Sequence, residues 1–242
     1  IIFPNSDLVK DPSHWIGLIE QYKISLWNTV PQLSSLLAEN IDQTCDSLRL
    51  FLLSGDWIPV KLPQFLSKVC PNAKIISLGG ATEGSIWSIW FEIKEVKDSW
   101  KSIPYGIAMP NQTMLVLNDS YKNCPPGIIG EIHIGGDGVA LNYWGDEEKT
   151  NLSFIDTKQF GRIYKTGDLG RWNVNGYIEF IGRKDSQIKL HGYRIELDEI
   201  SHHISKVDGV DDAVSILTDL NNQNKICAYY TGTEQDPSSM LQ

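Results

Sequence analysis

The segment YKTGDLGRWNVNGYIEFIGRKDSQIKLHGYR, which starts at Tyr164, carries isolated carboxylates among glycines in a stretch otherwise patterned as β-hairpins. A carboxylate held at a turn is a good bidentate acceptor for two vicinal hydroxyl groups. The alternative is that Asp168 and Asp185 are ordinary turn-capping residues, a role that aspartate also favours. The same stretch carries basic residues, among them Arg183, Lys189 and Arg194. The segment is therefore a candidate site for a hydroxyl-bearing ligand.

A second candidate is the glycine-rich loop SLGGATEGS, residues 77–85. Its paired glycines, Gly79 and Gly80, would let backbone N–H groups approach a ligand closely, while Thr82 and Glu83 add a hydroxyl and a carboxylate. Taken alone, the loop is equally well explained as a glycine turn followed by solvated polar residues, because glycine-rich patterns often match by chance.

The elements around this loop predict where it lies. Residues 1–99 alternate short apolar runs, beginning with IIF, with helical patterns at 14–22, 32–40 and 62–69, which is typical of a parallel sheet covered by helices on both faces. Open parallel sheets bind ligands at the carboxyl ends of their strands. Three strands end near Asn28, Ser54 and Leu78, so we expect one site to involve all three ends.

Two further zones complete the predicted fold. Residues 100–184 contain short strands separated by Gly, Pro and Asn turns, with Asn175-Gly176 as a hairpin signal, and predict an antiparallel sheet or a distorted β-barrel. Residues 185–242 begin a small α+β domain, in which the helical pattern RIELDEISHHISKV precedes two strands. The closing PSSMLQ resembles the first turn of another helix, so the domain is expected to be incomplete. The predicted class is α/β plus β plus α+β.

Composition and charge limit the classes of partner. With 242 residues, 41% hydrophobic and 21% charged, the chain has the composition of a folded protein with room for more than one domain. Its formal net charge of -9 argues against nucleic acid or an anionic membrane as the main partner. No apolar run approaches the roughly 20 residues that span a bilayer, and the first residues lack a secretory signal pattern, so we expect a cytoplasmic protein.

The cysteines and histidines do not indicate a metal site. The four cysteines lie far apart without a CxxC pair, which favours reduced, partly buried thiols at Cys45, Cys70, Cys124 and Cys227. The adjacent His202 and His203 would point about 100° apart around a helix, with nothing nearby to complete a ligand set.

Four motifs together resemble those of a known family. GGATEG, GEIHIGGDGVALNYW, YKTGDLGRW and GRKDSQIKLHGYRIELDEI closely resemble ordered signatures of the adenylation domains of nonribosomal peptide synthetases, in the adenylate-forming superfamily. The resemblance runs from about Lys23 to Gly232. It implies an enzyme that activates an amino acid with ATP, forming aminoacyl-AMP and pyrophosphate. The acyl group would then pass to the phosphopantetheine thiol of a carrier protein.

The resemblance also implies roles for individual residues. Asp168 would contact the ATP ribose, and Asp185 would be the hinge about which the small C-terminal domain rotates between adenylating and thioester-forming poses. Segment 189–193 would face the site in the second pose. Thr82 would contact phosphate, and Glu83 would hold Mg²⁺, a cation that prefers a carboxylate plus phosphate oxygens. The nucleotide site would consist of Gly79, Gly80, Ala81, Thr82, Asp168 and Arg183.

Other parts of the family pattern do not occur in the sequence. The phosphate loop and the aspartate that holds the substrate amino group would precede Ile1, and the catalytic lysine would follow Gln242. Because electrostatic stabilisation is usually the largest catalytic contribution, we expect this chain alone to adenylate poorly or not at all. Some members of the family carry an inserted tailoring domain before their last signature motifs. Neighbouring synthetase domains and such an inserted domain are therefore both candidate partners.

Aligning the motifs implies a pocket for the substrate side chain. It would be lined by Asn28, Leu52, Ser54, Leu78, Ile86 and Trp87. The set is small, mostly apolar and uncharged, so burying a long or charged side chain there would be costly. The series resembles the pocket of cysteine-activating domains, including those of thiazoline-forming synthetases. L-Cysteine is the predicted substrate, with alanine, serine and valine as alternatives.

Two other functions remain open on the residues alone. A non-catalytic fragment or docking module could retain a nucleotide-shaped groove, and a stand-alone acyl-CoA ligase belongs to the same superfamily. The GYRIELDEI stretch and the amino-acid-like pocket argue against the ligase.

Overall fold

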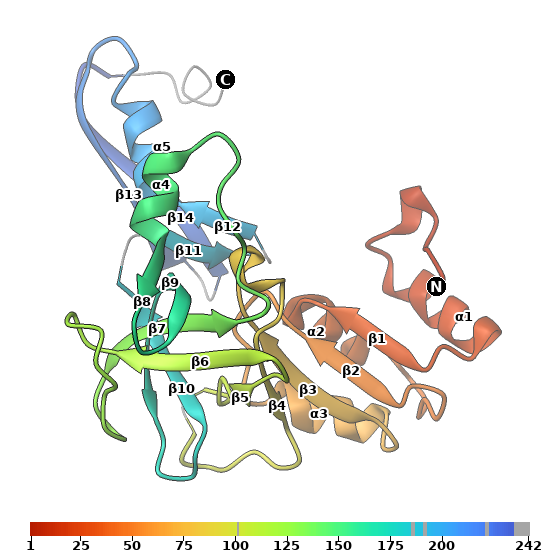
Figure 1. Cartoon of the computed structure of the whole chain (residues 1–242). Helices are drawn as coiled ribbons and strands as arrows, with labels where there is room; N and C mark the ends of the chain where they lie inside the picture. Colours follow the sequence, from red (N-terminus) through yellow and green to blue (C-terminus); the bar gives the residue numbers. More distant parts are fainter. Residues whose placement is uncertain (101, 185–186, 191–192, 221–222, 235–242) are drawn as a thin grey trace. The chain divides into compact units, whose positions relative to one another are not determined.

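The computed structural model describes residues 1–100, 102–184, 187–190, 193–220 and 223–234. Contacts divide the chain into a first unit, Ile1–Gly182, and a second unit, Arg183–Gln242. The elements of both are labelled in Figure 1.

The first sheet of the first unit is mixed. Its order is β1-β2-β3-β4-β5. Strands β1 (Leu26–Thr29), β2 (Leu50–Leu53) and β3 (Lys74–Gly79) are parallel, as predicted. Strands β4 (Ile89–Glu92) and β5 (Ile107–Ala108) then continue the sheet in antiparallel pairs. The parallel strands therefore end together at one edge, where the glycine-rich loop follows β3.

The predicted helices form at α1 (Pro12–Tyr22), α2 (Pro31–Asn40) and α3 (Leu62–Val69), after a short 3-10 turn η1 (Ser6–Leu8). Each of the three α-helices has proline in its first turn, where the missing N–H breaks no helical bond. The IIF run, predicted as a strand, has no regular structure. Within the part of the chain that the structure describes, no strand pairs with it.

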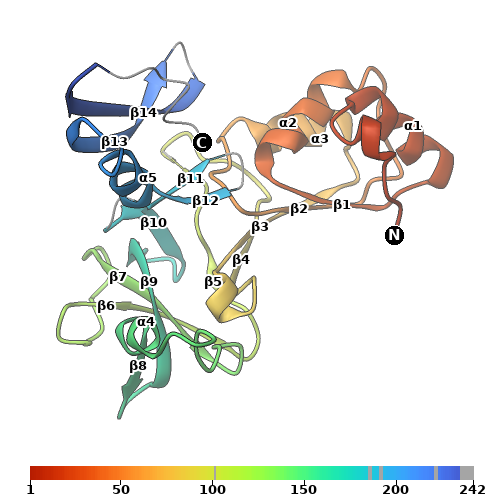
Figure 2. The ribbon, with the colours of Figure 1, turned by 90° about the horizontal axis from the view of Figure 1, so that it is seen from above.

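Helices cover one face of the parallel strands, not both. The buried cluster under the helices contains Phe51, Leu53 and Ile75, whereas Leu52, which points to the opposite face, is half-buried. Figure 2 shows α1, α2 and α3 on the same side of β1–β3. The prediction of helices on both faces is wrong for the described residues. Apolar strands indicate that both faces are buried but do not specify which segment covers each one.

The second sheet is antiparallel and has the order β10-β9-β7-β6, with β8 paired to β9. Its strands are β6 (Gln112–Leu117), β7 (Gly130–Gly136), β8 (Phe154–Thr157), β9 (Gly161–Trp172) and β10 (Ile178–Arg183), and helix α4 (Glu147–Ser153) precedes β8. Gly176 has φ 81° in the β9–β10 turn, as the Asn-Gly signal predicts. In the described residues this sheet is open. Of the two predicted alternatives, the structure therefore has the antiparallel sheet and not a closed β-barrel.

One buried cluster joins the second sheet to the first. It includes Ile89 from β4, Ile134 from β7 and Ile178 from β10, and Ala81 of the glycine-rich loop packs against it. Gly106 also pairs with Ile178 through backbone hydrogen bonds in both directions. The loop after β3 is therefore fixed by both sheets.

Among its described residues, the second unit has two antiparallel strand pairs and one helix. Strands β11 (Gln187–Leu190) and β12 (Tyr193–Glu196) pair, helix α5 (Leu197–Ile204) follows, and β13 (Val210–Leu220) pairs with β14 (Gln223–Gly232). The Ser201 hydroxyl accepts a hydrogen bond from the Ser215 N–H at 2.8 Å, which joins α5 to β13. This matches the predicted helix and two strands. The predicted closing helix PSSMLQ lies outside the described residues.

Candidate functional site

The three parallel strands bring one set of predicted pocket residues onto the same face. Asn28, Leu52 and Ile76 are register partners across β1, β2 and β3. Side chains two residues apart share a face of a strand, so Leu78 lies on the same face as Ile76. This is the face opposite the helices. Asn28 is exposed, Leu52 is half-buried and Leu78 is buried.

The loop after β3 is shaped by close packing at its glycines. A Cβ at Gly79 would lie 2.0 Å from the Tyr105 ring, and one at Gly80 would lie 2.6 Å from the Ile86 carbonyl oxygen. Gly80 also has φ 146°. From the sequence, these glycines are expected to let a ligand approach the backbone closely. The structure adds a second reason, because the chain itself occupies the space beside both.

Residues after the GGATEG motif adopt a costly backbone conformation. Ser85 and Ile86 have φ of 64° and 72°, in the left-handed region that β-branched residues rarely enter. The Ile86 N–H donates to the Ala81 carbonyl at 3.1 Å, and Ile86 is 68% exposed. Such strain persists only where the surroundings enforce it and is common at binding sites. Trp87, the next predicted lining residue, is half-buried.

Glu83 lies in a 3-10 turn, η2 (Thr82–Gly84), and is only 8% exposed. Its Oε1 accepts a hydrogen bond of 2.6 Å from the Tyr143 hydroxyl, and its carbonyl oxygen accepts one of 2.8 Å from the Ala140 N–H. Burial, and next the hydrogen bond to Glu83, raise the pKa of the Tyr143 phenol above its ordinary value. Tyr143 therefore stays a protonated donor to the carboxylate. Thr82 beside it is exposed.

Asp168 is buried, with 5% of its surface exposed, in the interior of β9. Glu131 pairs with Leu169 and His133 with Lys165, so the three residues 166–168 stand opposite a single residue of β7. The predicted turn at Asp168 is wrong: the TGD motif forms a β-bulge. Gly167 has φ 73°, a conformation that suits glycine. Bulges redirect side chains and are frequent beside functional sites.

The bulge is held by a short chain of hydrogen bonds. The Thr166 hydroxyl donates to the Ile132 carbonyl at 2.6 Å and accepts from the Asp168 N–H at 3.0 Å. The side chain of Thr166 thus replaces a ladder bond that the extra residues interrupt. The sequence signal TGD contains both partners, although the bulge depends on the register with β7.

Four other predicted residues belong to the second unit. Arg183 is the last residue of β10 and the first of that unit. Asp185 lies outside the described residues. Lys189 and Arg194 are backbone partners in the β11–β12 pair.

An aromatic group that the sequence does not predict lies beside Gly79. Trp57, from the loop after β2, meets Phe180 of β10 edge-on at 4.8 Å between ring centroids. Phe180 meets Tyr105 at 5.7 Å, and Tyr105 covers Gly79. Trp57 is about half exposed. The group is built from positions 57, 105 and 180, so no local pattern could reveal it.

The described residues contain no group of three or more His, Cys, Asp or Glu side chains that could hold a metal ion. A cation at Glu83 would therefore need oxygen ligands from a bound molecule, which is how Mg²⁺ is usually held in nucleotide sites.

Elsewhere, burial raises the pKa of the Cys70 thiol to about 12, with nearby Cys45 adding to the effect. Among the described helices, none is long and apolar enough to cross a membrane.

Comparison with known proteins decides the family. Residues 1–144 match the family model described as AMP-binding enzyme. The chain belongs to this family. Bacitracin synthase 1 of Bacillus licheniformis is 51% identical over 185 residues, which cover 76% of this chain and 4% of the synthase. Pyochelin synthetase PchF of Pseudomonas aeruginosa is 40% identical over 235 residues, which cover 96% of this chain and 13% of that protein.

A solved structure supports the fold of the AMP-binding family along almost the whole chain. A nonribosomal peptide synthetase protein containing adenylation and PCP domains, bound to a vinylsulfonamide inhibitor, superposes with a TM-score of 0.85 at 26% identity. The alignment covers 96% of this chain and 41% of that one. The predicted resemblance to adenylation domains is confirmed, and this AMP-binding chain spans less than half the length of each of these three proteins.

Proposed function

We propose that the chain is part of an amino-acid adenylation domain of nonribosomal peptide synthesis. The domain would form aminoacyl-AMP and pyrophosphate from an amino acid and ATP, then load the acyl group onto the phosphopantetheine thiol of a carrier protein. The observation that carries this proposal is the GGATEG loop with its buried Glu83, at the carboxyl edge of the parallel strands, in a member of the AMP-binding family. The relative solved with adenylation and PCP domains supports the carrier partner.

The nucleotide would be bound by residues from both sheets. Asp168, fixed by the bulge, would accept hydrogen bonds from the ribose hydroxyls. Thr82 would contact phosphate. The aromatic group around Tyr105 offers a planar surface for the base.

Mg²⁺ fits the donor set at Glu83. One carboxylate with phosphate oxygens and water completes the coordination that this cation prefers. When bound, the ion would neutralise phosphate charge as pyrophosphate leaves. Arg183 would add positive charge at the nucleotide. Asp185 would be the hinge, which the boundary between the two units at Gly182 supports.

L-Cysteine is the amino acid that we propose as substrate. Asn28, Leu52 and Leu78 share one sheet face, and Ser54 follows β2 at the same edge. None of the six proposed lining residues is charged, so the pocket would disfavour a charged side chain. The polar groups of Asn28 and Ser54 suit a small, weakly polar group such as a thiol. Alanine, serine and valine are the alternative substrates, because their side chains are also small and uncharged.

Amino-acid-dependent exchange of pyrophosphate into ATP tests this proposal in the complete protein. We expect exchange across the proteinogenic set to be highest with L-cysteine. A clear preference for another amino acid would overturn the substrate and leave the adenylation function intact. Exchange with none of them would overturn the function itself. Formation of coenzyme A thioesters from carboxylic acids would favour the acyl-CoA ligase instead.

A further inference from the structure

Tyr143 holds the Glu83 carboxylate through the hydrogen bond described above. Both residues are at least partly shielded from water, and their hydroxyl and carboxylate oxygens are 2.6 Å apart. A hydrogen bond to a carboxylate in such surroundings is stronger than one between neutral groups. A carboxylate has about four lone-pair sites, so it can accept this bond and still coordinate a cation.

The tyrosine ring is itself fixed from several directions. Phe154 meets it at 5.4 Å between ring centroids, and the Lys149 ammonium lies 4.9 Å from its centroid. The Tyr143 N–H donates to the Thr150 hydroxyl oxygen at 3.0 Å. The hydroxyl is therefore presented to Glu83 by a rigid ring, with little freedom to lose when the bond forms.

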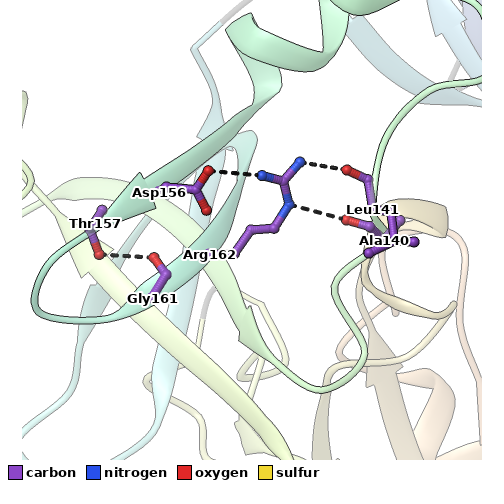
Figure 3. Close-up of polar contacts among 6 residues, drawn as sticks. All are labelled: Ala140, Leu141, Asp156, Thr157, Gly161 and Arg162. Carbon is purple, nitrogen blue, oxygen red and sulfur yellow. Dashed lines mark hydrogen bonds and ion pairs between the residues drawn. The ribbon is translucent and has the colours of Figure 1, made fainter.

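The segment that carries Tyr143, residues 138–143, is attached to both the loop and the second sheet. The Ser85 hydroxyl donates to the Gly138 carbonyl at 2.8 Å. On the other side, Arg162 donates to the carbonyls of Ala140 and Leu141 at 3.5 and 2.5 Å, as Figure 3 shows.

Arg162 is held in turn by β8. Its Nη1 lies 3.1 Å from the Asp156 carboxylate, and its guanidinium packs over the Phe154 ring at 5.0 Å. The turn between β8 and β9 is closed by the Thr157 hydroxyl, which donates to the Gly161 carbonyl at 3.0 Å. Glu83 is thus connected to the antiparallel sheet through its backbone, by Ala140, and through its side chain, by Tyr143.

We propose that Tyr143 is a positioning residue that holds the Glu83 carboxylate in the orientation required for a divalent cation bound with ATP. The inference rests on the proposed function, because it concerns the same nucleotide site. Tyr143 touches neither nucleotide nor metal on this account. It acts by restricting the rotamers of Glu83, which otherwise has three rotatable side-chain bonds.

The test is the effect of Mg²⁺ on binding of a non-hydrolysable ATP analogue, measured by calorimetry in the complete protein. Wild type is expected to bind the analogue more tightly with Mg²⁺ than without it. In Tyr143→Phe, which keeps the ring and removes the hydroxyl, this enhancement should shrink about three- to tenfold. Metal-free binding should stay unchanged. Mn²⁺ spectroscopy on the same complexes gives a second readout of cation binding.

Tyr121→Phe is the matched control. Tyr121 lies in the connection between β6 and β7 of the second sheet, and its ring centroid is 5.9 Å from that of His133. It should leave the enhancement at the wild-type value. Glu83→Gln supplies the second comparison: once the carboxylate is gone, adding Tyr143→Phe should change the enhancement no further.

The outcomes separate the inference from the function. Wild-type enhancement in Tyr143→Phe, or a further loss when it is added to Glu83→Gln, would overturn the positioning role while nucleotide binding stands. A wild-type protein that binds no nucleotide would overturn the proposed function and this inference with it.

Discussion

The candidate site depends on a few side chains whose surroundings restrict them more than their motifs indicate. Glu83 and Asp168 can be selected from the sequence because each is a carboxylate beside glycines. Tyr143 cannot, because it lies 60 residues from its partner Glu83. The bulge that buries Asp168 is also invisible in the sequence, since it depends on which residues of β7 and β9 face each other.

Asp168→Ala is expected to weaken ATP binding and slow adenylation. Loss of a hydrogen-bonded carboxylate costs about 1.5–3 kcal/mol, or roughly a tenfold to hundredfold rise in the ATP concentration required. Pyrophosphate exchange at varied ATP measures this. Asp119→Ala, in the exposed connection after β6, is the control. Wild-type ATP dependence in the Asp168 variant would exclude the ribose role.

Tyr143 should also make stability depend on pH. Its pKa in the folded protein is raised, by burial first, above the ordinary value of about 10. The folded state therefore disfavours the phenolate, and the stability contributed by the neutral phenol is present below about pH 10 and lost as pH rises further. Urea unfolding of wild type should show a steeper loss between about pH 9 and 11 than Tyr143→Phe. Identical profiles would contradict a buried, hydrogen-bonded phenol.

At the scale of elements, the sequence predicted the parallel strands, their helices and the antiparallel strands, because each has a clear apolar period. It placed helices on both faces of the first sheet, whereas Phe51 and Leu53 face the helices of this chain and Leu52 does not. The aromatic contact between Trp57 and Phe180 likewise joins elements far apart in the sequence. The period of apolar residues indicates that one face of an element is buried. It does not indicate which segment packs against that face.

Gly79→Ala tests how tightly the loop after β3 is packed. The added methyl would overlap the Tyr105 ring, so we expect a loss of about 1–3 kcal/mol in the free energy of unfolding. Gly17→Ala is the matched control. Gly17 lies in α1 with no atom near the added Cβ, so this variant should gain about 0.5–1 kcal/mol. Equal stability of the two variants would show that Tyr105 does not confine the loop.

At the scale of the whole molecule, the chain consists of two units that meet in sequence at Gly182 and Arg183. The sequence places the proposed hinge, Asp185, two residues beyond that boundary, on a family resemblance rather than on a physical signal. A hinge needs only a few backbone angles that can change, and no residue pattern is specific to that requirement. Its function must therefore be tested by kinetics.

Asp185→Pro is expected to separate the two half-reactions. Proline restricts φ to about −65°, so a rotation that changes this angle would be blocked in one of the two poses. Adenylation is measured by pyrophosphate exchange and thioester formation by loading of the carrier protein. One rate should fall much more than the other. Asp185→Ala leaves φ free and should retain both half-reactions. If proline reduced both equally in a protein that still folds, Asp185 would have a structural role, and the rotation would have to take place at another residue.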